Sequence, residues 1–461
     1  MVTLSPGRAP AVRRSLAGLL AAATVIASAA LGAAPASAAE PVQVGLFGTQ
    51  DPTYDGVFRQ SLSLLAFVSA GEEPPAEAVA WLLDQQCADG GFQAYRSDTS
   101  APCTESDPVN YVGEDSNSTA LASAALTVLG ELDAADAALG WLESAQNADG
   151  GFPYFLGGTS DVNSTAIALL ATNAVGLSPS QVTNGSASAA DYLTSLQVGC
   201  PGAATDEDGG FAYADFSAGT ANDSATVQAA LAITGAALPF VADPPSLDIP
   251  RADCPAPAAA PAATTEAPAA AAAAVDLTPA ELAGGYIART LTAYDNAIPE
   301  LDFGTGLRKP GTVSAGDTAW AVLALSAIGV GGDQRDAALD VLLGQVGGGS
   351  ARKAAAASVS DEAPGLLALA ALAVVSADGS QATVEGLVAR VGATMRTAPA
   401  SSSPTPSPTG STEPTPSPTD AGGLAPSGAS PLTPGLAGSG ALLVLLGAAA
   451  LLVSRRQGSH A

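Results

Sequence analysis

Three copies of one short motif decide the fold: Gln86-Cys87-Ala88-Asp89-Gly90-Gly91-Phe92, Gln146-Asn147-Ala148-Asp149-Gly150-Gly151-Phe152 and Asp206-Glu207-Asp208-Gly209-Gly210-Phe211. An apolar segment with an aromatic-Leu pair precedes each copy, and a Gln follows four residues after that Leu: Trp81-Leu82 with Gln86, Trp141-Leu142 with Gln146, Tyr192-Leu193 with Gln197. Repetition of this kind predicts a series of similar helical units. The repeated Gln and Gly-Gly-Phe are interpreted as scaffold, because Gln can hydrogen-bond exposed backbone and Gly allows a turn with positive φ.

A second element alternates with the first. A short polar residue opens a long Ala/Leu segment, and such residues favour the N-cap of a helix because a side-chain oxygen can accept a free backbone N–H. The openings are Asp55, Asn117, Asn163, Asp223, Asp317 and Asp361. These segments are apolar nearly all round, which predicts buried helices.

Six buried helices are expected, beginning near 55, 117, 163, 223, 317 and 361. Each is followed by a more amphipathic helix, near 75–86, 133–146, 187–197, 278–294, 333–345 and 381–394. Six inner and six outer helices are what an α6/α6 toroid requires. The sequence therefore predicts an all-α toroid domain over 40–396, with an Ala/Pro-rich insertion at 253–276.

The aromatic-Leu pair, the Gln and the Gly-x-aromatic ending together resemble the QW repeat of squalene and hopene cyclases and the repeats of protein prenyltransferase β-subunits. Phe92, Phe152 and Phe211 stand where the cyclases have a terminal Trp. The clear repeats cover about 55–235, whereas 277–396 match by helix pattern alone. The resemblance implies the α/α toroid of the terpenoid cyclase and prenyltransferase superfamily, which transcobalamin-like carriers also use.

In such a toroid the inner-helix openings would face one rim of the central cavity. The candidate ligand-binding residues are Asp55, Asn117, Asn163, Asp223, Asp317, Trp320 and Asp361. Capping alone also explains the polar members, and core packing also explains Trp320. Tyr95, Tyr154 and Tyr213 are further candidates for a ligand-facing wall.

Two other groups of residues carry chemistry. Asp206 and Asp208 lie in one acidic loop and are calcium candidates, although the loop lacks the ligand spacing of a known calcium motif. Cys87, Cys103, Cys200 and Cys254 predict two disulfides. Four cysteines allow three pairings, of which the near-neighbour pairing Cys87–Cys103 and Cys200–Cys254 is preferred.

The net charge is −28, with 44 acidic and 16 basic residues. Such a surface repels polyanions, which argues against nucleic acid as a partner. No cofactor is expected.

The two ends of the chain indicate export and anchoring. Residues 1–38 have the basic, apolar and small-residue order of a signal peptide. Residues 397–431 are a Pro/Ser/Thr stalk, 432–454 a candidate transmembrane helix and 455–461 a basic cytoplasmic tail. Leu424-Ala425-Pro426-Ser427-Gly428 resembles a sortase sorting signal, with Ser427 in the place of the usual Thr. We expect the protein on the outer face of the plasma membrane or in the cell wall, attached by sortase or by a plain membrane anchor.

The missing residues narrow the function. The chain has no Asp-x-Asp-Asp acid motif of the cyclases, and its only histidine, His460, lies in the tail, so the exported part has no imidazole for a zinc site or a catalytic triad. The sequence thus favours a non-catalytic surface module whose cavity or rim binds an apolar ligand or a protein. The alternatives are an enzyme acting on an isoprenoid or a glycan, and a cobalamin-type carrier.

Overall fold

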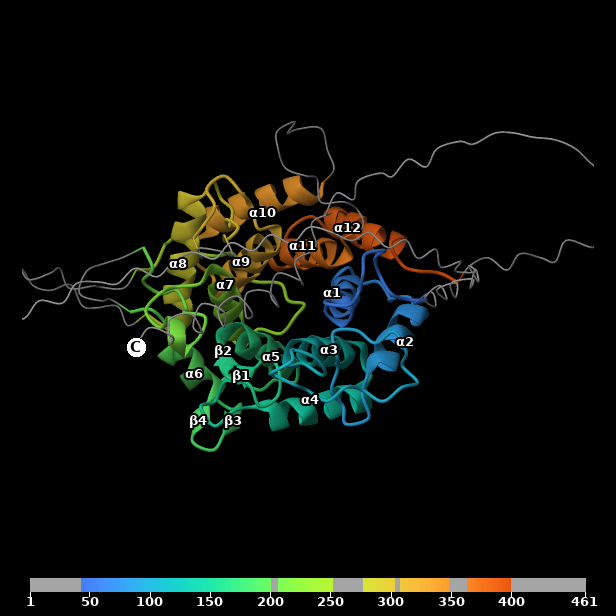
Figure 1. Ribbon diagram of the computed structural model, residues 1–461. Coiled ribbons are helices and arrows are strands. Elements are labelled where there is room, and N and C mark those ends of the chain that lie inside the picture. Colours follow the sequence, from blue (N-terminus) through green and yellow to red (C-terminus); the bar gives the residue numbers. More distant parts are fainter. Residues whose placement is uncertain (1–42, 200–205, 252–276, 303–306, 348–362, 399–461) are drawn as a thin grey trace, which may run out of the picture. The chain divides into compact units, whose positions relative to one another are not determined.

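The computed structural model describes residues 43–199, 206–251, 277–302, 307–347 and 363–398, and these ranges form twelve α-helices (Figure 1). The inner helices are α1 (Gly56–Ser69), α3 (Ser116–Leu129), α5 (Val162–Ala174), α7 (Asp223–Ala232), α9 (Ala315–Ile328) and α11 (Pro364–Ser376). The outer helices are α2 (Ala76–Gln85), α4 (Leu132–Ala145), α6 (Ala189–Ser195), α8 (Pro279–Ala293), α10 (Gly332–Val346) and α12 (Gln381–Ala393).

The inner helices close a ring. Each packs on the next inner helix along the chain, and α11 packs back on α1 (Figure 1). Every outer helix packs on the inner helix that precedes it, and α4, α8, α10 and α12 also contact the following inner helix. The helices after residue 277 therefore belong to the same ring, and the predicted α/α toroid is confirmed.

The composition of the inner helices explains why they can lie inside. They are rich in Ala and Leu, and α3, α5, α7 and α11 are buried on nearly every side. Small Ala side chains let neighbouring backbones approach closely, and an all-round apolar surface is stable only when it is surrounded by other elements. The outer helices bury one face only, as in α4, where Ala135, Ala138, Trp141 and Leu142 are buried.

The repeated motif forms the corner between an outer helix and the next inner helix. Gln86 Nε2 donates to the carbonyls of Gly90 (3.1 Å) and Ala134 (2.8 Å), and so ties the turn to the next outer helix. Gln146 and Gln197 make the equivalent pairs of hydrogen bonds. The scaffold interpretation of the Gln is confirmed.

The first Gly of each corner is required by space as well as by conformation. Gly90 has φ +99°, and a Cβ there would lie 2.2 Å from the carbonyl oxygen of Ala137. Gly150 and Gly209 have the same handedness and the same close approach, to Ser188 and Leu282. Only Gly fits such a site.

A threonine in the first turn of the inner helices accepts a hydrogen bond from the backbone of each corner. The N–H of Phe92 donates to Thr119 Oγ1 at 2.9 Å, that of Phe152 to Thr165 at 2.9 Å, and that of Phe211 to Thr226 at 2.8 Å. Each such buried hydrogen bond contributes about 1 kcal/mol net.

The ring is closed by a further corner that is shared between the two ends of the domain. The segment after α12 pairs with Gly45-Leu46-Phe47: the N–H of Gly45 donates to the carbonyl of Arg396 (2.9 Å), and the N–H of Arg396 donates to that of Leu46 (2.8 Å). Gly45 has φ +90°, and the N–H of Phe47 donates to Gln60 Oε1, which stands in for the threonine. This copy forms no continuous motif in the sequence, because its two halves lie at opposite ends of the domain.

The described residues also contain two short hairpins. β1 (Phe152–Pro153) pairs with β2 (Ser160–Asp161), and β3 (Thr183–Asn184) pairs with β4 (Ala187–Ser188), both antiparallel. Both hairpins lie in the loops around α5 and α6. The second strand of each hairpin leads directly into its helix, so the hairpin fixes the direction in which the chain enters that helix.

Several predicted segments lie outside the described residues. They are the signal segment 1–38, the insertion 253–276, the stalk from residue 399, the sorting-like motif 424–428, the span 432–454 and the tail 455–461. Among the residues that are described, no helix is both long enough and apolar enough to span a bilayer.

Candidate functional site

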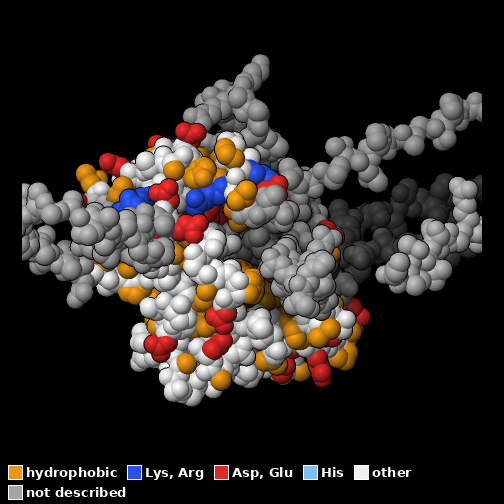
Figure 2. Space-filling model, turned by 60° about the vertical axis from the view of Figure 1, so that its left-hand side comes forward, with side chains coloured by type: hydrophobic (Ala, Val, Ile, Leu, Met, Phe, Trp, Pro, Cys, Tyr) orange, Lys and Arg blue, Asp and Glu red, His pale blue; other side chains and the backbone are white. Residues whose placement is uncertain are grey.

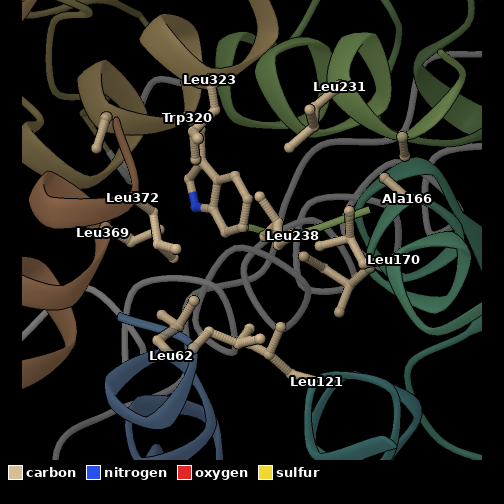
Figure 3. Close-up of a cluster of buried hydrophobic side chains, with 14 of the residues drawn as sticks. Leu62, Leu121, Ala166, Leu170, Leu231, Leu238, Trp320, Leu323, Leu369 and Leu372 are labelled. Atoms are coloured by element: carbon tan, nitrogen blue, oxygen red, sulfur yellow. The ribbon is translucent and has the colours of Figure 1, made fainter. Parts of the chain in front are cut away.

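The centre of the ring is occupied by side chains from all six inner helices (Figure 3). The residues that converge there are Leu62, Leu121, Ala166, Leu170, Leu231, Leu238, Trp320, Leu323, Leu369 and Leu372. Trp320 is 3% exposed and Leu238, from the segment after α7, is 2% exposed. Trp320 thus belongs to the packed centre and not to the rim where it was expected.

A polar layer lies one helical turn above this apolar centre, at the N-terminal ends of the inner helices. Residues three or four apart share one face of a helix, so Asn117 lies on the side of Leu121 and Asn163 on the side of Ala166. On α7 the same face carries Ser224, Gln228 and Leu231. The inner ring therefore changes from apolar at its centre to polar at this mouth.

Asn163 and Gln228 form the least satisfied part of this layer. Asn163 Nδ2 donates to Gln228 Oε1 at 3.1 Å, which joins α5 to α7. Asn163 Oδ1 and Gln228 Nε2 are buried without a hydrogen-bond partner in the described structure. The two residues are 5% and 2% exposed, so they present one acceptor and one donor inside the protein.

Asp317 adds a carboxyl group to the same layer. Ser314 Oγ donates to Asp317 Oδ2 at 2.7 Å, and Ser224 of the neighbouring helix also hydrogen-bonds the carboxyl. Burial raises the pKa of Asp317, and the two serine hydrogen bonds oppose that rise. Asp317 is the third residue of α9, so the prediction that it caps this helix is wrong.

The caps of α3 and α5 are Asp115 and Asp161, and not the predicted Asn117 and Asn163. Asp115 Oδ1 accepts from the Ser118 N–H at 2.7 Å, and Oδ2 accepts from Ser118 Oγ at 2.8 Å. Asp161 makes the same two contacts with Ser164, both at 2.8 Å. Burial raises the pKa of Asp115 to about 7 and that of Asp161 to about 6, against the effect of the serine hydrogen bonds. The Asp-x-x-Ser spacing in the sequence could have revealed both caps.

Asp223 and Asp55 are held in ion pairs. Asp223 follows the true cap of α7, Asn222, and receives Arg308 Nε and Nη2, both at 2.7 Å, and the Tyr286 hydroxyl at 2.7 Å. Asp55 precedes α1 without a side-chain capping bond and pairs with Arg59 at 2.9 Å. Both carboxylates therefore fasten the chain near the mouth instead of presenting free oxygens to a ligand.

The tyrosines predicted as a wall separate into two kinds. Tyr154 and Tyr213 are equivalent, because their carbonyls accept from the first N–H of α3 (Ser116, 2.9 Å) and of α5 (Val162, 2.8 Å). Tyr95 lies one position further along and stacks on Trp81, with ring centroids 6.5 Å apart. Tyr95 lies beside the start of α1, where a Cβ on Gly56 would come within 3.4 Å of its own Cβ.

The remaining predicted residues lie in the acidic loop, in a disulfide or outside the described residues. Asp206 is exposed and Asp208 is buried, and Arg289 Nη2 donates to the Asp208 carbonyl, which places a cation at the loop proposed for calcium. Cys87 and Cys103 form a disulfide, the first of the two expected pairs. Cys200, Cys254 and Asp361 lie outside the described residues.

The comparison with protein families agrees with this architecture. Residues 58–249 match the family model of the prenyltransferase alpha-alpha toroid domain. No curated protein matches the chain. Among solved structures, the crystal structure of a protein from Actinoplanes is similar at 17% identity, covers 65% of this chain and 74% of that chain, and has a TM-score of 0.38. Residues 58–249 are thus part of a prenyltransferase-type alpha-alpha toroid domain.

Proposed function

We propose that the toroid is a non-catalytic binding module that takes a polar ligand at the mouth formed by the N-terminal ends of α3, α5, α7 and α9. The observation that carries this proposal is the buried amide pair Asn163–Gln228, which has one acceptor and one donor without a partner. A buried polar atom without a partner costs about 1–3 kcal/mol. A ligand that supplies both missing hydrogen bonds would recover that free energy.

The packed centre favours the mouth over the cavity. An apolar ligand inside the ring would have to displace Trp320, Leu238 and their neighbours, which already fill the space between the inner helices. At the mouth the available groups are amides, a hydroxyl and a carboxyl, from Asn163, Gln228, Ser224 and Asp317. These groups suit a ligand with hydroxyl or amide functions better than a hydrocarbon.

The two ends of the chain support a location of this module outside the cell. With a signal segment, a stalk and an anchor of the kind expected from the sequence, the toroid would stand outside the cell on a flexible tether. The module would then capture its ligand from the extracellular medium or the wall. Release of a reporter-tagged chain by protease shaving of intact cells tests this placement.

The binding proposal is tested with the double variant Asn163→Leu/Gln228→Leu in the full chain produced in its own host. We expect native mass spectrometry to find a bound small molecule on the wild type and to lose it in the variant. We also expect the variant to be as stable as the wild type or more stable, because it removes unsatisfied polar atoms. Thr226→Val, two residues before Gln228 on α7, is the matched control: it breaks a satisfied hydrogen bond, so it should lower stability and keep the ligand.

Two results would contradict the proposal. One is a ligand that stays equally well bound to the double variant. The other is a wild type without ligand together with a double variant that is destabilised as strongly as the Thr226 control, which would make the amide pair a structural link between helices.

A further inference from the structure

Five aromatic side chains lie beside the mouth and form what we call the aromatic shelf: Tyr111, Tyr154, Phe155, Tyr213 and Phe216. Their rings form two groups. The centroids of Tyr111 and Phe155 are 6.1 Å apart and those of Tyr154 and Phe155 4.6 Å apart, and Tyr213 lies 6.1 Å from Phe216. Phe216 is 61% exposed and Tyr111 is 42% exposed, whereas Phe155 is 7% exposed, so each group presents one ring to solvent and packs it on a less exposed neighbour.

Backbone hydrogen bonds fasten the shelf to the helices that carry the amide pair. The carbonyl of Tyr213 accepts from Val162, the residue before Asn163, and the carbonyl of Tyr154 accepts from Ser116, the residue before Asn117. The carboxyl of Asp161, which caps α5, acts electrostatically on the hydroxyls of both Tyr154 and Tyr213. The two aromatic groups therefore flank the start of α5.

The charge of this half of the ring restricts what can settle there. Residues 97–250, which include α3 to α7, contain 19 acidic residues and no Lys or Arg. On the face drawn in Figure 2, basic side chains gather in the upper part, whereas acidic side chains occur in both the upper and the lower parts. Arg308, from outside this range, reaches the start of α7 but is paired with Asp223 there. An anionic ligand would therefore meet mainly acidic side chains.

We infer that the ligand of the mouth is a neutral saccharide, an inference that rests on the proposed function. Aromatic faces pack well against the C–H faces of a pyranose ring, because both surfaces are flat and apolar. A single hydroxyl oxygen can donate to Asn163 Oδ1 and accept from Gln228 Nε2, and so satisfies both unpaired atoms at once. Asn117, Ser224 and Asp317 offer further amide, hydroxyl and carboxyl groups to neighbouring hydroxyls of the same sugar.

The shelf and the amide pair have separate tasks in this arrangement. The shelf supplies contact area outside the mouth, and the amide pair selects a hydroxyl inside it. Peptides that bind by strand addition need the exposed edge of a strand, and the two short hairpins of the described structure offer only two-residue strands for that mode. A neutral sugar can pack its flat C–H face on the aromatic shelf and place a hydroxyl at the amide pair.

The inference is tested by probing the purified full chain against an array of neutral and acidic glycans and then titrating the neutral hits calorimetrically. We expect binding to neutral saccharides only. Phe216→Ala and Tyr111→Ala should each weaken it at least tenfold, and Asn163→Leu/Gln228→Leu should abolish it. Leu132→Ala, at an exposed apolar residue (57%) where outer helix α4 begins, is the matched control and should leave the affinity unchanged.

The outcomes separate this inference from the proposed function. A chain that binds no neutral glycan, but carries a host molecule that the double variant loses, overturns the saccharide inference and keeps the binding module. Binding of acidic glycans or of a protein alone overturns the inference as well. Neutral-glycan binding that is indifferent to Phe216→Ala and to the amide substitutions places the sugar elsewhere and overturns both.

Discussion

The first and second corners of the ring have the same backbone and different chemistry. In both, a Gln binds the turn, a left-handed Gly approaches the next outer helix and a Phe N–H reaches a Thr. In the second corner Asn147 donates to Ser160 Oγ at 2.9 Å, and Ser160 donates to Asp149 at 2.8 Å. That network is neutral except for one carboxylate.

In the first corner other residues stand at the positions equivalent to Asn147 and Ser160. Cys87 stands in the place of Asn147 and is bonded to Cys103. Glu114 stands in the place of Ser160 and hydrogen-bonds both Asp89 and the Trp141 side chain. One framework therefore accepts either a hydrogen-bonded network or a disulfide with a pair of carboxyls, because the Gly, Gln and Thr contacts hold the backbone by themselves.

The largest expected effect tests that shared framework. Gly90→Ala and Gly150→Ala each place a Cβ within about 2.3 Å of a carbonyl oxygen in a left-handed conformation, so we expect each to lower the free energy of unfolding by more than ~3 kcal/mol. Gly130→Ala is the matched control, because Gly130 has φ +82° and nothing within 4 Å of its added Cβ. It should cost about 1 kcal/mol. Urea unfolding measures all three, and equal losses would show that close approach does not distinguish the corners from an ordinary helix end.

The next effect belongs to the first corner alone. Cys87→Ser/Cys103→Ser opens a loop of sequence separation 16, and we expect a loss of about 3 kcal/mol. Asn147→Ala, at the equivalent place in the second corner, should lose about 1–2 kcal/mol because it removes hydrogen bonds only. Chemical denaturation with and without a reductant gives both values. A disulfide variant as stable as the wild type would show that the corner contacts alone suffice.

A smaller effect concerns pH. The pKa of Glu114 is raised to about 7, first by desolvation and then by the charge of Asp89. The folded state thus binds a proton that the unfolded state releases near pH 4.5, so stability falls as pH rises from about 4.5 to about 7. Glu114→Gln keeps the shape without the charge. After allowance for solvent screening, it should raise the free energy of unfolding by about 1 kcal/mol at pH 8 and leave it unchanged near pH 4. Thermal unfolding across this pH range tests the direction of the effect. A gain in stability that is the same at pH 4 and pH 8 would contradict a raised pKa of Glu114 as its cause.

The smallest expected effect is the counterpart in the second corner. Ser160→Ala removes the hydroxyl between Asn147 and Asp149, which should cost about 1 kcal/mol. The Ser160 hydroxyl does not titrate in this range, so we expect the same loss at pH 5 and pH 8. A loss that grows with pH would contradict the expected difference, in which only the first corner has a pH-dependent stability.

Much of the fold could be predicted from local pattern. The Gln and Gly-Gly-Phe repeats and the Ala/Leu segments identified both kinds of helix, because periodicity and turn residues act over a few positions. The caps were misplaced by two residues at Asn117 and Asn163, since several polar side chains stand together at each opening and only geometry decides which of them accepts. The mouth was predicted as a set of similar caps, whereas Asp223 and Asp55 are ion-paired and Trp320 is part of the packed centre.

The sequence by itself determined the helical repeat, its corner residues and the acidic character of the surface, because these depend on residue type and short spacing. The tertiary structure alone decided that Gly45-Leu46-Phe47 completes the ring with Arg396, that the centre is filled, and that Gln228 meets Asn163. These three features join residues that are 65 or more positions apart in the chain or that belong to different helices. Such contacts exist only after the ring has closed and have no signature in local sequence.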